Sequence, residues 1–209
     1  RGITAEHVAE SAPTACPCAQ GADRDDYFSA NHALEMDVEA HGPRLTVTDA
    51  CTSGADAIGL AMDLISTGQC QCVLCGGADA LSLVPHTGFA RLMIYSDQPC
   101  RPFDRDRDGF VMGEGAGLIV IESLEHALAR GATPLAELVG YGTSADAYHL
   151  TAGPEDGNGA RRAMETAIRQ AGVTVDEIDH INAHATSTQV GDKGELAAIK
   201  TLFGAHPVA

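Results

Sequence analysis

The positions of apolar residues along the chain follow two different spacings. Apolar residues three or four positions apart, followed by a glycine, predict helices, whereas alternating or continuous apolar runs predict strands. In residues 55–66, for example, Ile58, Met62 and Ile65 form one apolar stripe that stops before Gly68. The predicted helices cover residues 27–40, 55–66, 124–130, 160–171 and 193–203. The predicted strands cover residues 44–49, 70–75, 115–122, 134–141 and 180–183.

This alternation of strands and helices predicts an α/β domain with a largely buried sheet. Residues 11–26, which are rich in small residues and proline, are predicted to form a surface loop. Among its 209 residues the chain has 13 Lys and Arg against 29 Asp and Glu, so its formal charge is −16. A chain this acidic repels nucleic-acid phosphate and anionic lipid, and we expect neither as a partner. No apolar run approaches the roughly 18 residues that span a bilayer.

The chain has seven cysteines. Their odd number and irregular spacing favour free thiols in a reducing compartment, so we expect a cytoplasmic protein. Cys70, Cys72 and Cys75 could suggest a zinc site. On a strand, however, the first two would face one side and the third the other, so they could not converge on one metal ion. We therefore expect no metal site and interpret these cysteines as small buried hydrophobic residues.

One local plan occurs twice: a predicted strand leads into a turn of small residues that carries one reactive side chain, and a helix follows. The reactive residue is Cys51 in residues 48–54 and His184 in residues 182–188. A helix N-terminus next to Cys51 would favour its thiolate and offer backbone N–H groups to an oxyanion. Cysteine and histidine together are what nucleophilic acyl chemistry requires. The alternatives, a space-filling Cys51 and a structural His184, stay open from the sequence alone.

Two further motifs have ordinary explanations. Residues 104–109 alternate Asp and Arg before Gly109 and look like a calcium loop, but the glutamate that such a loop needs is replaced by Gly115. The glycine-rich residues 113–117 have the wrong spacing for a dinucleotide fingerprint, and a predicted strand rather than a helix follows them. We interpret both segments as tight turns.

An ordered series of motifs resembles the elongating β-ketoacyl-acyl-carrier-protein synthases, which are condensing enzymes of the thiolase superfamily. The motifs occupy residues 49–54, 76–80, 101–104, 107–117, 146–151 and 181–188, followed by Gly191, Asp192 and Glu195. The resemblance spans nearly all of residues 40–205. It implies an α/β fold with a thiolase-like layered αβαβα core, incomplete in this chain. It also implies no cofactor, because the family's substrates are carried on the phosphopantetheine of acyl carrier protein.

The resemblance assigns roles in a decarboxylative condensation. Cys51 would accept an acyl chain from a carrier-protein thioester. His184 would hydrogen-bond the malonyl thioester carbonyl and so stabilise the enolate left by loss of CO2. Thr186 and Thr188 match the family positions that bind the phosphopantetheine arm. The implied activity is condensation of the Cys-bound acyl chain with malonyl carrier protein in fatty acid or in polyketide or polyene biosynthesis.

The supporting residues implied by the resemblance are two carboxylates. Glu195 matches a position that orients a family lysine, and Asp192 is its near neighbour. In the family, that lysine, a second histidine and a glycine-rich loop with a phenylalanine follow later than Ala209. We therefore expect residues 1–209 to be the central part of a single ketosynthase catalytic domain whose N- and C-terminal parts are missing. Ala185 stands where the family usually has glycine.

The alternative function is a non-catalytic partner subunit resembling a chain-length factor, although such subunits lack the reactive cysteine. The expected partners are acyl carrier protein and a second ketosynthase-like subunit, in a homodimer or a heterodimer. Because carrier proteins are acidic too, a docking patch would need basic residues, and the dense basic cluster is Arg91, Arg101, Arg105 and Arg107. The alternative is that Arg105 and Arg107 only neutralise the neighbouring aspartates.

Overall fold

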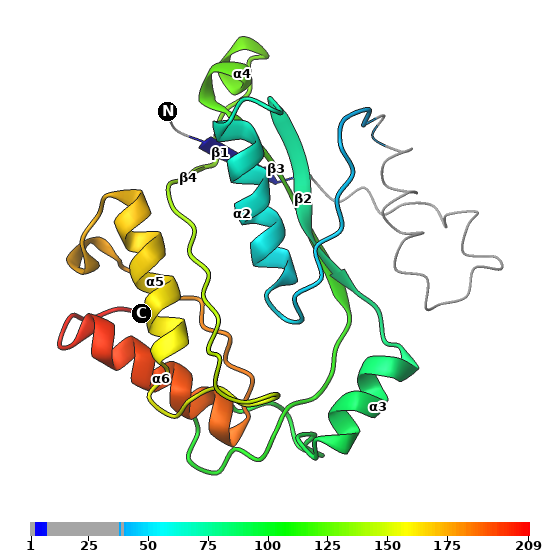
Figure 1. The fold of residues 1–209 in the computed structure, drawn as a ribbon, viewed down its shortest axis with the longest axis vertical. Coiled ribbons are helices and arrows are strands. Elements are labelled where there is room, and N and C mark those ends of the chain that lie inside the picture. The colour runs from blue at the N-terminus through cyan, green and yellow to red at the C-terminus, as the bar shows by residue number, and fades with distance from the viewer. Residues whose placement is uncertain (1–2, 8–37, 39) are drawn as a thin grey trace. The chain divides into compact units, whose positions relative to one another are not determined.

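The computed structural model describes residue 38, residues 40–209 and the backbone of residues 3–7. The predicted loop at 11–26 lies outside the described residues, as does the predicted helix at 27–40 except for residues 38 and 40. The chain divides into two compact units. One is drawn from Arg1–Ser82 and Glu114–Leu138, and the other from Leu83–Gly113 and Val139–Ala209. Figure 1 shows their helices and strands.

The first unit is built on a four-stranded sheet. The strands are β1 (Ile3–His7), β2 (Cys72–Asp79), β3 (Gly115–Ser123) and β4 (Ala136–Leu138). Their order is β2-β3-β1-β4, and each neighbouring pair is antiparallel. Helix α2 (Ser53–Ser66) packs on β2 and β3, and the short helix α4 (Leu124–Ala129) follows β3 directly (Figure 1).

The core of this unit forms where α2 faces the sheet. Met62 and Ile65 of the predicted apolar stripe are buried and Ile58 is half-buried, so that prediction is confirmed. Opposite them, Ile121 of β3 is 0% exposed. Each fully buried side chain of this size stabilises the fold by roughly 1.5–3 kcal/mol. The stripe therefore fixes the side of α2 that contacts the sheet.

The strand predictions in this unit succeed where a neighbouring strand is present. The predicted strands at 70–75, 115–122 and 134–141 correspond to β2, β3 and the shorter β4. The predicted opposite facing of Cys72 and Cys75 is confirmed, because Cys72 is exposed and Cys75 is buried. The expectation that these cysteines are buried is therefore correct for Cys75 and wrong for Cys72. The strand predicted at 44–49 is wrong. This segment is largely exposed, joins none of the four strands, and ends in an isolated bridge between Asp49 and Cys51.

The regular secondary structure of the second unit, where it is described, consists of helices. Its helices are α3 (Leu83–Arg91), α5 (Asn158–Ala171), the short 3-10 helix η2 (Val175–Glu177) and α6 (Gln189–Phe203). The helices predicted at 160–171 and 193–203 are confirmed as α5 and α6, although α6 begins four residues earlier than expected. Gly157, just before α5, lies against Gly194 of α6: a Cβ on Gly157 would be 2.0 Å from the Gly194 carbonyl oxygen. This close approach sets the start of α5 on the second turn of α6.

The strand predicted at 180–183 is also wrong. The N–H of Ile181 donates to the carbonyl of Ala209, and the N–H of Ala209 donates to the carbonyl of Asp179. This pairing with a single residue does not form a ladder, so the segment is extended without being a strand. Within the described residues, no three His, Cys, Asp or Glu side chains gather in a way that could hold a metal ion. In that same part of the chain, no helix is long and apolar enough to cross a bilayer.

Candidate active site

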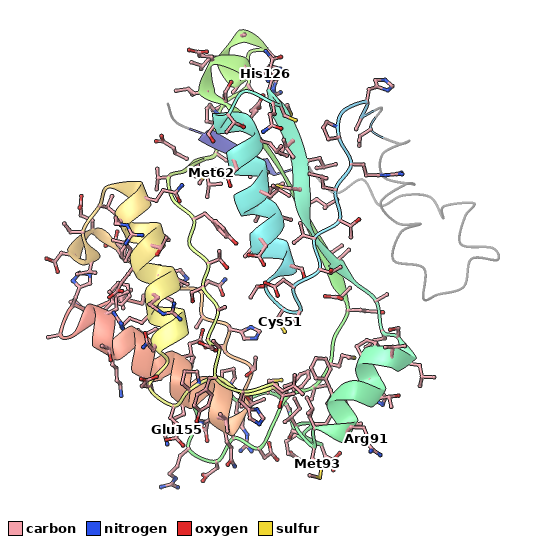
Figure 2. All side chains as sticks on the ribbon, viewed as in Figure 1. Cys51, Met62, Arg91, Met93, His126 and Glu155 are labelled. Carbon is pink, nitrogen blue, oxygen red and sulfur yellow. The ribbon has the colours of Figure 1, made fainter. Side chains whose placement is uncertain are left out.

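Cys51 lies in a tight turn that leads directly into α2. Its thiol is exposed and stands two residues before Ser53, the first residue of the helix (Figure 2). The preceding residue, Ala50, adopts the left-handed conformation with φ 47°. The Ser53 hydroxyl closes the turn, since it accepts from the N–H of Asp49 and donates to the carbonyl of Ala50, both at 2.7 Å. Cys51 therefore lies exposed in a turn that leads into a helix, which confirms the predicted order of turn and helix.

The start of α2 is held against the sheet by two glycines. A Cβ on Gly77 of β2 would lie 3.5 Å from the Cα of Gly54, in the first turn of α2. The helix backbone thus approaches the strand backbone closely at this point. The Thr52 hydroxyl lies 2.8 Å from the carbonyl oxygen of Asp49 and 2.8 Å from Oδ2 of Asp56. These contacts link the segment that carries Cys51 to the first turn of α2. The position of Cys51 consequently depends on the packing of α2 on β2.

His184 lies in the second predicted turn, where it is exposed. One carboxylate of α6 holds the backbone there: the N–H of His184 donates to Oε1 of Glu195 at 2.6 Å, and the N–H of Ala185 donates to Oε2 at 2.9 Å. Ala185 has φ 51°, a conformation that costs a non-glycine residue of order 1 kcal/mol and needs support from its surroundings. Glu195 supplies that support. This contact to the histidine turn is additional to the lysine-orienting role that the resemblance implied.

Thr186 and Thr188 lie side by side beyond His184. Their hydroxyl oxygens are 2.8 Å apart, and both side chains are half-buried. Between them, Ser187 is 1% exposed and has φ 66°, so the backbone turns sharply and brings the two threonines to the same side. A Cβ on Gly191 would lie 2.5 Å from the Thr188 hydroxyl oxygen, so glycine leaves room for this pair. The predicted phosphopantetheine residues thus form one local hydroxyl pair.

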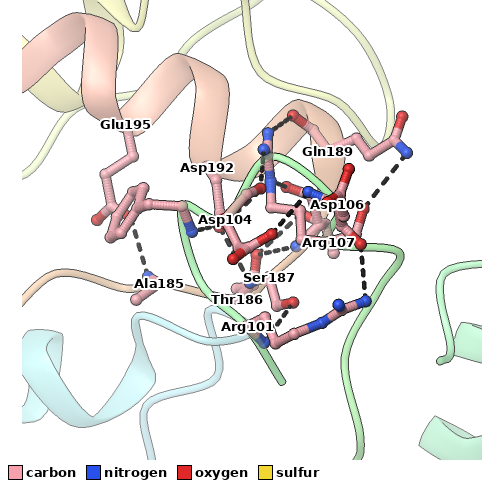
Figure 3. Close-up of polar contacts among 12 residues, drawn as sticks. Arg101, Asp104, Asp106, Arg107, Ala185, Thr186, Ser187, Gln189, Asp192 and Glu195 are labelled. Carbon is pink, nitrogen blue, oxygen red and sulfur yellow. Dashed lines mark hydrogen bonds and ion pairs between the residues drawn. The ribbon is translucent and has the colours of Figure 1, made fainter. Parts of the chain in front are cut away.

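Asp192, in the first turn of α6, is the most enclosed charged group of this unit's described part, with 1% exposure. Its Oδ1 accepts from the N–H of Ser187 at 3.0 Å, and its Oδ2 accepts from the N–H of Phe103 at 2.7 Å. The Nε of Arg107 lies 3.2 Å from the same Oδ2. Figure 3 shows these contacts converging on one carboxylate. Asp192 therefore joins residues 101–107 to the turn that carries the two threonines.

Arg107 is the partner of Asp192 and is itself largely enclosed. Its guanidinium also donates to the carbonyls of Thr188 at 3.2 Å, Gln189 at 2.6 Å and Asp104 at 2.9 Å (Figure 3). From the sequence, Arg107 was predicted in a basic cluster that could bind a carrier protein, and the sequence pattern did not indicate its ion pair with Asp192. The contacts of the Phe103 amide and of Ser187 were likewise missed, because backbone donors leave no signature in residue spacing.

The alternating segment 104–109 behaves only partly as expected. Arg105 does pair with neighbouring Asp106, at 3.4 Å, which confirms the neutralisation alternative for that residue. The same expectation is wrong for Arg107, whose ion pair is with Asp192 on α6. The carboxylate of Asp104 accepts from the N–H of Asp106, and that of Asp108 accepts from the Ser96 hydroxyl, both at 2.7 Å. These carboxylates bind protein donors and form a turn, as predicted.

The structure thus assembles most of the predicted site residues on one loop and one helix. His184, Thr186 and Thr188 belong to the loop, while Asp192 and Glu195 lie three residues apart on α6. Cys51 belongs to the first compact unit and the other five to the second, so the two halves of the predicted site are defined separately, each within its own unit.

Comparisons with known proteins identify the class of protein. The family model for the N-terminal domain of beta-ketoacyl synthases matches residues 9–127, and the model for the C-terminal domain matches residues 135–209. The chain belongs to the β-ketoacyl synthase family, which confirms the resemblance drawn from the motifs. A curated relative, "3-oxoacyl-[acyl-carrier-protein] synthase 2" from Staphylococcus aureus, is 44% identical over 181 residues. The alignment covers 84% of this chain and 45% of that relative, so the chain spans less than half of its length.

Solved structures agree with this assignment. "The ishigamide ketosynthase/chain length factor" matches with a TM-score of 0.80 and 42% identity, over 85% of this chain and 44% of that one. "AntDE:AntF (apo): type II PKS acyl-carrier protein in complex with its ketosynthase bound to the hexaketide" matches with a TM-score of 0.82 and 34% identity, over 87% and 47%. The predicted thiolase-like ketosynthase fold is therefore confirmed.

Proposed function

We propose that this chain carries the nucleophile and one histidine of a decarboxylating ketosynthase. The observation that carries the proposal is the exposed thiol of Cys51, held by a left-handed Ala50 immediately before α2. A thiolate at a helix N-terminus is stabilised by the helix dipole. Family membership supports acyl transfer as the chemistry that uses this arrangement.

In the first step the Cys51 thiolate attacks the carbonyl carbon of an acyl thioester on carrier protein. The tetrahedral oxyanion collapses and expels the phosphopantetheine thiolate, which takes up a proton. The acyl chain is then bound to Cys51 through a new thioester. The positive end of the dipole of α2, which begins two residues after Cys51, would favour the negative charge of this oxyanion.

In the second step malonyl carrier protein loses CO2. The bond between its methylene carbon and its carboxylate breaks, and the electron pair forms the enolate of an acetyl thioester. The His184 imidazole would donate a hydrogen bond to that enolate oxygen, and the hydroxyls of Thr186 and Thr188 would bind the phosphopantetheine arm. The enolate carbon then attacks the Cys51 thioester, the C–S bond breaks, and a β-ketoacyl carrier protein leaves while the Cys51 thiolate is restored.

The proposal includes the assembly in which this happens. Residues 1–209 would form the central part of one ketosynthase catalytic domain, acting with acyl carrier protein and within a homodimer or a heterodimer. Similar solved structures support both partner classes, because their titles name an acyl-carrier protein in one case and a chain length factor in another. The reaction would need no resident cofactor, since both substrates arrive on phosphopantetheine. A chain-length-factor-like subunit without catalysis is the second candidate.

Intact-protein mass spectrometry tests the proposal. After incubation of the full-length protein with acyl carrier protein bearing an acyl chain, we expect a mass increase equal to that acyl group, and none in Cys51→Ala. Cys72→Ala is the matched control, because Cys72 is also exposed but lies on a strand. Acylation that survives Cys51→Ala would overturn the nucleophile assignment. Absence of acylation in the wild type would favour the chain-length-factor alternative.

A further inference from the structure

Two carboxylates of α6 support different parts of one loop. Glu195 binds the N–H groups of His184 and Ala185, whereas Asp192 binds the N–H of Ser187, which lies between Thr186 and Thr188. The two acids are three residues apart, so they lie on neighbouring positions of the same helix face. The loop from His184 to Thr188 consequently rests on α6 at two separate points.

We propose that α6 positions the histidine and the hydroxyl pair independently, through Glu195 and Asp192 respectively. This inference rests on the proposed function, because it assigns Glu195 to the decarboxylation step and Asp192 to binding of the phosphopantetheine arm. Both are positioning residues, since each acts through the backbone of another residue. Arg107 belongs with Asp192, because its guanidinium binds that carboxylate and also the carbonyls of Thr188 and Gln189.

The histidine half depends on two short contacts to one carboxylate. Hydrogen bonds from backbone N–H groups to a charged acceptor are stronger than those to a neutral acceptor. Glu195→Gln keeps one oxygen acceptor but places an NH2 group against the second N–H. Ala185 in its left-handed conformation then loses part of what holds it, and the adjacent His184 backbone is released. Thr186 and Thr188 stay attached through Ser187 and Asp192.

The hydroxyl half depends on a buried carboxylate that joins two loops. Asp192→Asn places an NH2 group near either the Ser187 N–H or the Phe103 N–H and removes the charge that faces Arg107. Because Asp192 and Ser187 are both 1% exposed, water is not at hand to replace the lost contacts. The Ser187 backbone, with φ 66°, then relaxes and the two threonine hydroxyls separate. The His184 amide stays on Glu195.

Steady-state condensation kinetics of the full-length protein separate the two roles. We expect Glu195→Gln to lower kcat about ten- to hundredfold with little change in KM for malonyl carrier protein. We expect Asp192→Asn to raise that KM about tenfold or more with little change in kcat. Glu155→Gln and Asp106→Asn are the matched controls, because both carboxylates are exposed and pair only with exposed cations in the described structure. The proposal would be overturned if Glu195→Gln and Asp192→Asn changed kcat and KM in the same way, or if neither variant changed kcat or KM.

Hydrogen–deuterium exchange of the same variants gives a readout that needs no activity. Asp192→Asn should accelerate exchange in peptides covering 101–107 and 186–188 together, and Glu195→Gln should do so at 184–185. If Asp192→Asn does not fold, Arg107→Lys keeps a cation near Asp192 but loses the carbonyl contacts, and should raise the same KM less. If hydrogen–deuterium exchange at 186–188 is unchanged in Asp192→Asn, or in Arg107→Lys where Asp192→Asn does not fold, positioning by Asp192 is refuted. If the variants show these exchange changes but the wild-type protein catalyses no condensation, the proposed function is refuted and the positioning by Glu195 and Asp192 is not.

Discussion

Glu122 offers a sharp test of what stabilises the first unit. It stands near the end of β3 with 1% exposure, yet it is charged. Its two carboxylate oxygens each lie 3.0 Å from Nε of Arg130, and Nδ1 of His126 lies 2.5 Å from Oε2. Both partners come from α4 and the residue that follows it. The carboxylate therefore fastens α4 to the end of the strand.

The pKa of Glu122 is held below its ordinary value of 4.5, chiefly by the hydrogen bond from Arg130, against the opposing effect of burial and with further help from His126. A lowered folded-state pKa means that ionised Glu122 stabilises the fold above pH 4.5. The contribution fades as the pH falls through the folded-state pKa. Removing one partner of a buried pair can cost about 3–5 kcal/mol. Here the abandoned cations reach solvent, because the Arg130 and His126 side chains are 42% and 34% exposed, so we expect about 2 kcal/mol.

Urea unfolding of Glu122→Gln and wild type at pH 7 and in acid measures this difference. The variant should be about 2 kcal/mol less stable at pH 7, and the two proteins should converge as the pH falls below 4.5. Glu125→Gln, an exposed neighbour on α4, should change stability by less than about 0.5 kcal/mol. A difference between Glu122→Gln and wild type that stays constant from pH 7 into acid would refute the electrostatic reasoning.

Three further outcomes follow from single contacts. Burial raises the pKa of the Cys75 thiol to about 11, so iodoacetamide at neutral pH should label the exposed Cys51 and Cys72 and leave Cys75 unmodified until denaturation, as read by peptide mass spectrometry. The Ser123 hydroxyl caps α4 by accepting from the His126 N–H, and Ser123→Ala should lower the free energy of unfolding by about 1 kcal/mol in urea titrations. Gly76 has φ +149° and a Cβ there would lie 2.0 Å from a carbonyl oxygen of β3, so Gly76→Ala should cost about 2 kcal/mol or more; an unchanged thermal midpoint would contradict this.

The spacing of apolar residues was sufficient to predict the helices and strands that bury an apolar face within one unit. The stripe through Met62 and Ile65 predicted α2, and the continuous apolar run predicted β3 to within one residue. The failures at 44–49 and 180–183 have a common cause. Alternating residues allow a strand, but a strand forms only beside a neighbour that completes its hydrogen bonds. The first segment joins no strand of the sheet, and the second meets Ala209 alone among its described backbone partners.

The candidate site divides in a similar way. The candidate residues Cys51 and His184 could be proposed from the sequence because each lies in a turn of small residues between a predicted strand and a predicted helix. The groups that hold the turns could not be found, since they act through backbone N–H donors. Asp192 was predicted only as a neighbour of Glu195. Its carboxylate contacts Ser187, five residues away in the sequence, and Phe103, which is 89 residues away. Such contacts depend on the packing of loops on α6, which spacing does not encode.

The structure also reduces the number of arginines that could form a docking patch for an acidic carrier protein. Arg107 is committed to the buried Asp192, and turning it outward would abandon a carboxylate that has 1% exposure. Arg105, with 91% of its side chain exposed, forms a surface ion pair with Asp106, and such a pair contributes little to stability and can exchange partners. Arg91 is exposed at the C-terminal end of α3 (Figure 2). Arg91→Glu should therefore weaken carrier-protein affinity while leaving the His184 loop intact, whereas Arg107→Glu should disturb that loop first.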